Sequence, residues 1–164
     1  MNIISYLKKI KYCIIYKIGV HFPYSKIRVR SLRALGYEVG TDVYFPEDLV
    51  VTMGYNNRGC LKLGDRVSIG PRCVLVVTAH PNASSLRNII KVKERWITIG
   101  KDVWLGAGVV VLPEITIGEG AIIGAGSVVT KDIPAHSVAV GNPARVIKQV
   151  GESFHRKTQY NQIL

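Results

Sequence analysis

The stretch IGKDVWLGAGVVVLPEITIGEGAIIGAGSVVTKDIP, residues 99–134, decides the fold of this chain. Divided into sixes it reads IGKDVW, LGAGVV, VLPEIT, IGEGAI, IGAGSV and VTKDIP, and each block begins with an aliphatic residue. The same phase holds upstream in VGTDVY, FPEDLV, LGDRVS and IGPRCV, within residues 39–74. A period of six fits neither the turn of a helix nor simple alternation, and it is typical of a parallel β-helix built from short strands.

The repeat is regular enough to identify which residues point inward. Leaving out residues 81–98, there are thirteen first positions: Val39, Phe45, Val51, Asn57, Leu63, Ile69, Leu75, Ile99, Leu105, Val111, Ile117, Ile123 and Val129. Twelve of them are apolar, and the next residue is glycine in seven. We expect three blocks to make one triangular coil with the first residue inside the prism. We also expect the glycines to adopt the unusual backbone angles of the turns.

The fifth residue of many blocks is small, and we expect it to fit near a corner of the prism. These residues include Val67, Cys73, Ala79, Val103 and Ser127. Cys73 is therefore interpreted as a buried thiol without a chemical role. Together with Cys13 and Cys60 it makes an odd set, at spacings that match neither a zinc site nor a redox pair. This argues against a secreted disulfide framework and favours a reducing compartment, the cytoplasm.

Two interruptions of the repeat divide the chain. After His80 the sequence PNASSLRNIIKVKER, residues 81–95, cannot supply a face of the coil, and we expect a loop ejected from the prism. Insertions in solenoids gather at the binding face, so this loop marks a candidate site. A smaller excursion is expected around residues 54–60. The predicted organisation is an N-terminal helical and basic segment (1–38), a β-helix domain (39–148) and a C-terminal tail (149–164).

The composition describes a folded single domain: 164 residues, 48% hydrophobic and 20% charged. Its net charge of +11 is concentrated at the ends. Residues 1–40 hold eight basic residues and one acid, whereas residues 99–134 hold two basic residues and four acids. Neither end carries a motif that reads bases, which argues against nucleic acid as a partner. An anionic ligand or a membrane surface remains.

The N-terminal segment has the pattern of an amphipathic helix, with Ile3, Leu7, Ile10, Ile14 and Ile18 at helical spacing. No stretch reaches the roughly 18 uncharged apolar residues that would span a bilayer. Two interpretations remain open. The helix covers the main body, or it lies on anionic lipid through residues 1–20 as a peripheral contact.

Beyond these patterns, the chain resembles a known family. Residues 103–148, VWLGAGVVVLPEITIGEGAIIGAGSVVTKDIPAHSVAVGNPARVIK, resemble the hexapeptide-repeat acyltransferases, and in particular their maltose, galactoside and xenobiotic O-acetyltransferase branch. LVVTAHP, residues 75–81, is similar to the catalytic segment of that branch. The resemblance implies an all-β fold, a left-handed parallel β-helix. It also implies a homotrimer whose active sites lie between neighbouring prisms, with acetyl-CoA along one coil edge.

The resemblance also implies the chemistry. His80 corresponds to the general base that makes a sugar or alcohol hydroxyl nucleophilic, because the thioester of acetyl-CoA is already activated. An N–H donor is expected to stabilise the tetrahedral oxyanion.

The cofactor residues are carried over in the same way. Trp104 corresponds to the residue that flanks the histidine and the pantetheine arm, and main-chain groups of Ala107 and Ala125 correspond to those that bind the arm's amides. Thr130 and Lys131 are expected further along the same groove. Arg145 and Lys148 correspond to cations against the nucleotide phosphates.

No metal is implied. Some left-handed β-helix enzymes hydrate carbon dioxide with a metal held by three histidines across a subunit interface. Of the four histidines here (His21, His80, His136 and His155), only His80 has a suitable coil position.

The acceptor is the least determined part. The basic start and the LRALGYEVG entry into the solenoid resemble acetyltransferases of bacterial surface polysaccharide assembly. We therefore expect O-acetylation of a saccharide hydroxyl. N-acetylation of an amino sugar and a non-catalytic solenoid scaffold remain as alternatives.

Overall fold

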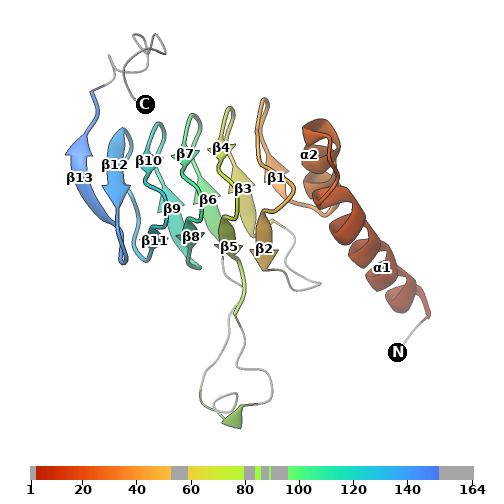
Figure 1. Ribbon diagram of the computed structural model, residues 1–164. Coiled ribbons are helices and arrows are strands. Elements are labelled where there is room, and N and C mark those ends of the chain that lie inside the picture. Colours follow the sequence, from red (N-terminus) through yellow and green to blue (C-terminus); the bar gives the residue numbers. More distant parts are fainter. Residues whose placement is uncertain (1–2, 53–58, 80–83, 86–88, 90–95, 152–164) are drawn as a thin grey trace.

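Aliphatic residues at every sixth position build a β-helix with three faces (Figure 1). The computed structural model describes residues 3–52, 59–79, 84–85, 89 and 96–151. Face A contains β1 (Glu38–Val39), β3 (Leu61–Leu63), β6 (Ile97–Ile99) and β9 (Ile115–Ile117). Face B contains β4 (Ser68–Ile69), β7 (Trp104–Leu105), β10 (Ile122–Ile123), β12 (Ser137–Val140) and β13 (Arg145–Gln149). Face C contains β2 (Val50–Thr52), β5 (Val74–Val76), β8 (Val110–Val111) and β11 (Val128–Val129).

Strand register confirms the coil and the ejected segments. Ile99 pairs with Ile117, which is 18 residues later (117 − 99), or three blocks of six. Leu63 pairs with Ile99, 36 residues later (99 − 63), so 18 extra residues lie outside the coil after β5. Val39 pairs with Leu63, 24 residues later (63 − 39), which leaves six extra residues after β2. The predicted loop 81–95 is mostly outside the described residues.

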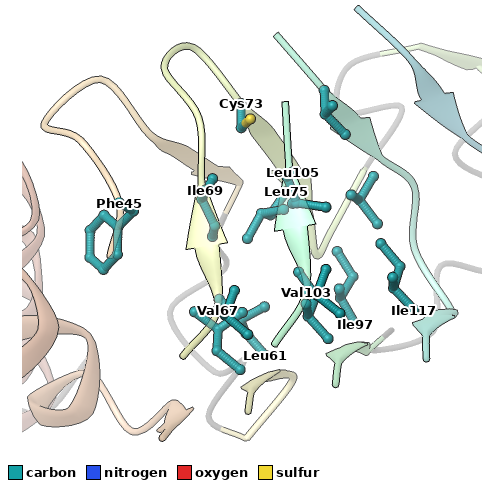
Figure 2. Close-up of a cluster of buried hydrophobic side chains, with 14 of the residues drawn as sticks. Phe45, Leu61, Val67, Ile69, Cys73, Leu75, Ile97, Val103, Leu105 and Ile117 are labelled. Atoms are coloured by element: carbon teal, nitrogen blue, oxygen red, sulfur yellow. The ribbon is translucent and has the colours of Figure 1, made fainter. Parts of the chain in front are cut away.

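The core is the column of side chains that the six-residue period predicts. Phe45, Ile69, Leu75 and Leu105 at first positions are fully buried, and they line the inside of the prism (Figure 2). Cys73 and Val103 at fifth positions are buried as expected, and burial raises the pKa of the Cys73 thiol.

One fifth-position residue departs from the expectation. Ala79 is exposed, and Val77 is the last buried residue before the chain leaves the prism. The prediction that Ala79 fits a corner is therefore wrong, because β5 is the last strand of its coil.

The structure also corrects the role of the repeat's glycines. The left-handed backbone angles fall mostly at the fourth position of the blocks, for example at Arg72 (φ 59°) and Asp102 (φ 57°), and not at the second-position glycines. These glycines are required by close approach of successive coils. A Cβ at Gly106 would lie 2.6 Å from the backbone nitrogen of Ala125, and one at Gly70 would lie 2.7 Å from that of Ala107.

Two helices and a short π-helix close the first coil: α1 (Ile3–Ile14), η1 (Ile15–Val20) and α2 (Ser25–Ala34). Leu32 of α2 is fully buried, and so is almost all of Arg28. The Arg28 guanidinium donates hydrogen bonds to the carbonyls of Phe45 (2.9 Å) and Phe22 (2.7 Å), and it lies over the Phe45 ring. Arg28 therefore holds α2 on the end of the prism and does not belong to the exposed basic surface.

One side of α1 and η1 packs on the first coil, as the covering interpretation expects. Tyr12, Ile15 and Tyr16 contact the core, and the Tyr16 hydroxyl donates to the carbonyl of Val51 (3.0 Å). Burial raises the pKa of the Tyr16 hydroxyl. In the described part of the chain, no helix has the length and apolar character needed to cross a bilayer.

Stability should depend on the inward column. Leu105→Ala should lower the free energy of unfolding by about 2–5 kcal/mol, because it removes buried atoms and leaves a cavity between coils. Urea unfolding at one fixed protein concentration measures this. Ile147→Ala on the exposed surface of β13 is the control, with an expected change of at most about 0.5 kcal/mol. Equal losses in the two variants would contradict the assignment of the core.

Candidate functional site

The corner between faces B and C presents exposed backbone. Ala107 and Ala125 occupy the same turn position in successive coils, and both are exposed. The Gly126 N–H donates to the Ala107 carbonyl (2.8 Å), which stacks the two turns directly. Each alanine is followed by a glycine with positive φ, Gly108 (67°) and Gly126 (69°). The small side chains and tight stacking leave a flat edge along which an extended ligand could lie.

Face B presents its outward side chains in one row. Trp104, Ile122 and Val138 pair across β7, β10 and β12, and the row continues to Lys148 on β13. Trp104 is 54% exposed, although it is a large aromatic side chain in the middle of a sheet. The row from Trp104 to Lys148 crosses three strand spacings, roughly 14 Å. An aromatic surface at one end and a cation at the other suit a long ligand with an anionic end.

Arg145 and Lys148 lie on β13, which pairs antiparallel with β12 and ends the solenoid. Both are exposed, and the Arg145 guanidinium donates to the Ala144 carbonyl (2.9 Å). The structure thus brings these two cations onto the same sheet as Trp104.

Thr130 and Lys131 lie at a different corner, between faces C and A, directly after β11. Thr130 is partly buried and Lys131 is exposed. This is the corner from which the chain leaves the prism after β5, on the way to His80. His80 itself lies outside the described residues.

The segment that leads into His80 is fixed by the preceding coil. The Thr52 hydroxyl donates to the Thr78 carbonyl (2.9 Å) and accepts from the Thr78 N–H (3.3 Å). Val77, between β5 and Thr78, is fully buried. Sequence reasoning missed Thr52, because a threonine 26 residues earlier in the chain gives no local signal for this contact.

The expected residues therefore form two groups within one chain. Trp104, Ala107 and Ala125 belong to face B and its corner with face C, whereas Thr130 and Lys131 lie at the corner between C and A. Face C separates the groups. The expectation that Thr130 and Lys131 continue the same groove holds in one chain only if the ligand crosses face C.

Face C has an apolar outer surface that sequence reasoning also missed. Its outward row consists of Val50, Val74, Val110 and Val128, which are paired in register. The corresponding row on face A is polar, with Glu38, Lys62, Thr98 and Thr116. The signal was present in the sequence, because the sixth residue of every third block from residue 45 to 128, outside the excursions, is valine.

The third corner, between faces A and B, is occupied by ion pairs between coils. Arg66 donates two hydrogen bonds of 2.6 Å to the Asp102 carboxylate, and Lys101 contacts Glu119 at 2.8 Å. These partners raise the pKa of Arg66 and of Lys101, and hydrogen bonds from Thr41 lower the pKa of Asp65. This corner links coils by charge.

The remaining histidines of the described chain lie away from these groups. His21 contacts the Glu47 carbonyl through Nδ1 (2.5 Å), and His136 occupies a turn with φ 52°. His155 falls outside the described residues. Within the described ranges, no group of three His, Cys, Asp or Glu side chains could hold a metal ion.

Comparison with known proteins gives one family. Residues 97–131 match the family described as "Bacterial transferase hexapeptide (six repeats)". The chain is 41% identical over 114 residues to "Galactoside O-acetyltransferase" of Escherichia coli (strain K12), which covers 70% of this chain and 54% of that protein. The chain spans about half the length of the curated relatives it matches.

Solved structures extend the similarity. A maltose O-acetyltransferase from Clostridium difficile 630 is 32% identical with a TM-score of 0.64, and the match covers 89% of both chains. A galactoside acetyltransferase in complex with coenzyme A is 29% identical with a TM-score of 0.63, covering 90% of this chain and 83% of that one. The shared fold is the left-handed β-helix expected from the sequence.

Proposed function

The chain belongs to the hexapeptide-repeat acyltransferases, and from that premise we propose that it transfers an acetyl group from acetyl-CoA to a hydroxyl of a saccharide. The observation that carries the proposal is the outward row of face B, which leads from the exposed indole of Trp104 to Lys148 beside the flat edge of Ala107 and Ala125. Relatives named for galactosides and maltose support the acceptor class. Surface polysaccharide is the proposed destination.

In this proposal acetyl-CoA lies along the corner between faces B and C. Main-chain groups of Ala107 and Ala125 bind the amides of its pantetheine arm, and the Trp104 indole covers the arm. Arg145 and Lys148 bind the nucleotide phosphates by charge-assisted contacts. Thr130 and Lys131 contact the cofactor from a neighbouring chain.

His80 is the proposed general base. Its imidazole takes the proton of the acceptor hydroxyl as the oxygen attacks the thioester carbon, giving a tetrahedral intermediate. The intermediate collapses with loss of the CoA thiolate, which takes the proton from the imidazolium. The products are the acetyl ester and free coenzyme A.

A cyclic trimer would bring the two groups of residues together. The valine row of face C gives each chain one apolar outer face, which is the natural contact between copies. If three prisms turn face C toward a common axis, the B–C corner of each chain meets the C–A corner of the next. Each site would then combine Ala107 and Ala125 of one chain with Lys131 and His80 of its neighbour.

Loss of the base should remove catalysis but not cofactor binding. His80→Ala should lower the rate of thiol release from acetyl-CoA by about 10²–10⁴-fold with sugars, nucleotide sugars or amino sugars as acceptors. In the unaltered protein, activity should rise with pH through the ordinary histidine range near 6.5, because the base must be neutral.

His21→Ala is the matched control, since His21 lies at the far end of the solenoid and should leave the rate unchanged. Coenzyme A binding by calorimetry separates the outcomes. A fully active His80→Ala variant would refute the base, and absence of coenzyme A binding by the unaltered protein would favour the scaffold alternative.

The cation on β13 should act on cofactor affinity. Lys148→Glu should raise the KM for acetyl-CoA about tenfold or more with little change in kcat, because a charge-assisted contact becomes a repulsion. Lys26→Glu, an exposed change on α2, is the control for net charge. Equal effects of the two substitutions would show that only overall charge matters.

The valine row should control assembly. Val110→Lys should convert the protein from three times 18.1 kDa to the single-chain mass in sedimentation experiments and abolish activity. Thr98→Lys is the matched control, because it changes the equivalent outward residue of the same coil on face A. A monomeric unaltered protein would contradict the proposed assembly.

A further inference from the structure

The side of α1 and η1 that faces away from the prism carries a row of large aliphatic side chains. These side chains are between 40% and 72% exposed and belong to Ile3, Leu7, Ile10, Ile14 and Ile18. Their spacing of three or four residues aligns them along the helix axis. The opposite side, with Tyr12, Ile15 and Tyr16, is the one that packs on the first coil. The segment is therefore apolar on two sides, of which the β-helix covers one.

An uncovered row of this size is characteristic of an interaction surface, because single-chain proteins rarely expose contiguous apolar patches. Figure 1 shows α1 across the end of the β-helix, with its N-terminal end directed away from the strands. The solenoid therefore does not obstruct a flat partner that approaches this row.

The surrounding charge identifies the kind of partner. The first acidic residue of the chain is Glu38, so residues 1–37 carry no carboxylate side chain. Lys9, Lys11 and Lys17 are exposed on the same helical segment, and Lys26 and Arg30 are exposed on α2. Two copies of this face would bring lysines together without a compensating acid. An apolar row among cations instead complements an anionic lipid surface, which offers both hydrocarbon and negative charge.

We propose that the exposed face of α1 and η1 docks on the surface of an anionic lipid bilayer. The row from Ile3 to Ile18 enters the boundary between headgroups and acyl chains, and the lysines contact lipid phosphates. The helix lies in the plane of the interface without crossing it.

This docking also bears on the acceptor, a consequence that rests on the proposed function. Tyr44, Ser68 and Trp104 pair in successive coils, so Trp104 lies two strand spacings, roughly 10 Å, from the first coil. A membrane-docked chain would hold its candidate site close to the lipid surface. The substrate class that fits is a saccharide attached to a lipid carrier.

Vesicle binding by the full chain tests the docking. Co-sedimentation should be strong with equimolar phosphatidylcholine and phosphatidylglycerol, weak with phosphatidylcholine alone, and reduced by raised salt. The double variant Ile3→Glu/Ile14→Glu should bind the anionic vesicles about 10²-fold or more weakly, because two buried aliphatic side chains become charged. Lys11→Gln/Lys17→Gln should lose most of the preference for anionic vesicles.

The matched control is Ile89→Glu/Ile147→Glu, which alters two equally exposed isoleucines elsewhere and should bind as the unaltered protein does. Thermal unfolding verifies that each variant folds. Absence of vesicle binding, or equal binding by the Ile3/Ile14 variant, would overturn the proposal. So would a change in oligomeric mass in that variant without vesicle binding, which would identify the row as a contact between copies. The assay uses no acetyl-CoA, so its failure would leave the proposed acetyl transfer untested and intact.

Discussion

Close stacking of successive coils is the constraint on which the rest of the structure depends. Paired strands lie about 4.8 Å apart, so each turn rests directly on the turn of the next coil. Gly70 and Gly106 are required there because a Cβ would meet the backbone of Ala107 and Ala125. The same stacking aligns Ile69 with Leu105 and Leu105 with Ile123 inside the prism. Because every coil repeats the last, a residue type placed once per coil becomes a continuous surface.

This repetition gives the three faces and three corners different chemistry. The corner between A and B carries ion pairs such as Arg66–Asp102, the corner between B and C presents backbone at Ala107 and Ala125, and the corner between C and A releases the excursion that leads to His80. The surfaces between them differ equally, with valines on face C and Trp104 on face B. A regular core therefore supports a polar outer face, an assembly face and a ligand edge at the same time.

The fold was predictable because burial imposes a period on the sequence. Leu105 and Ile117 are inward for the same reason that they begin blocks of six. Backbone angles were less accessible, since glycine at the second position gives the same letter whether it is needed for a left-handed φ or for close packing. The valines of face C were readable at the sixth position, but only once the blocks are sorted by face.

The site was predictable as a set of residues more than as an arrangement. Likeness to a family supplied Trp104, Ala107 and Lys148, which the structure gathers on face B and its edge. Thr130 and Lys131 fall at another corner, because a groove between two chains cannot be read from the order of residues in one. The same separation implies that an isolated chain holds only part of each site.

Mixing two inactive variants tests this shared site most directly. His80→Ala removes the base at one corner, and Ala107→Phe fills the cofactor edge at the other, so neither homotrimer should be active. Unfolding and refolding the variants together in equal amounts forms mixed trimers, and about a quarter of the sites should then combine two intact halves. Recovery of about a quarter of the unaltered activity is the predicted result. Activity no greater than the sum of the separate variants would contradict a site built from two chains.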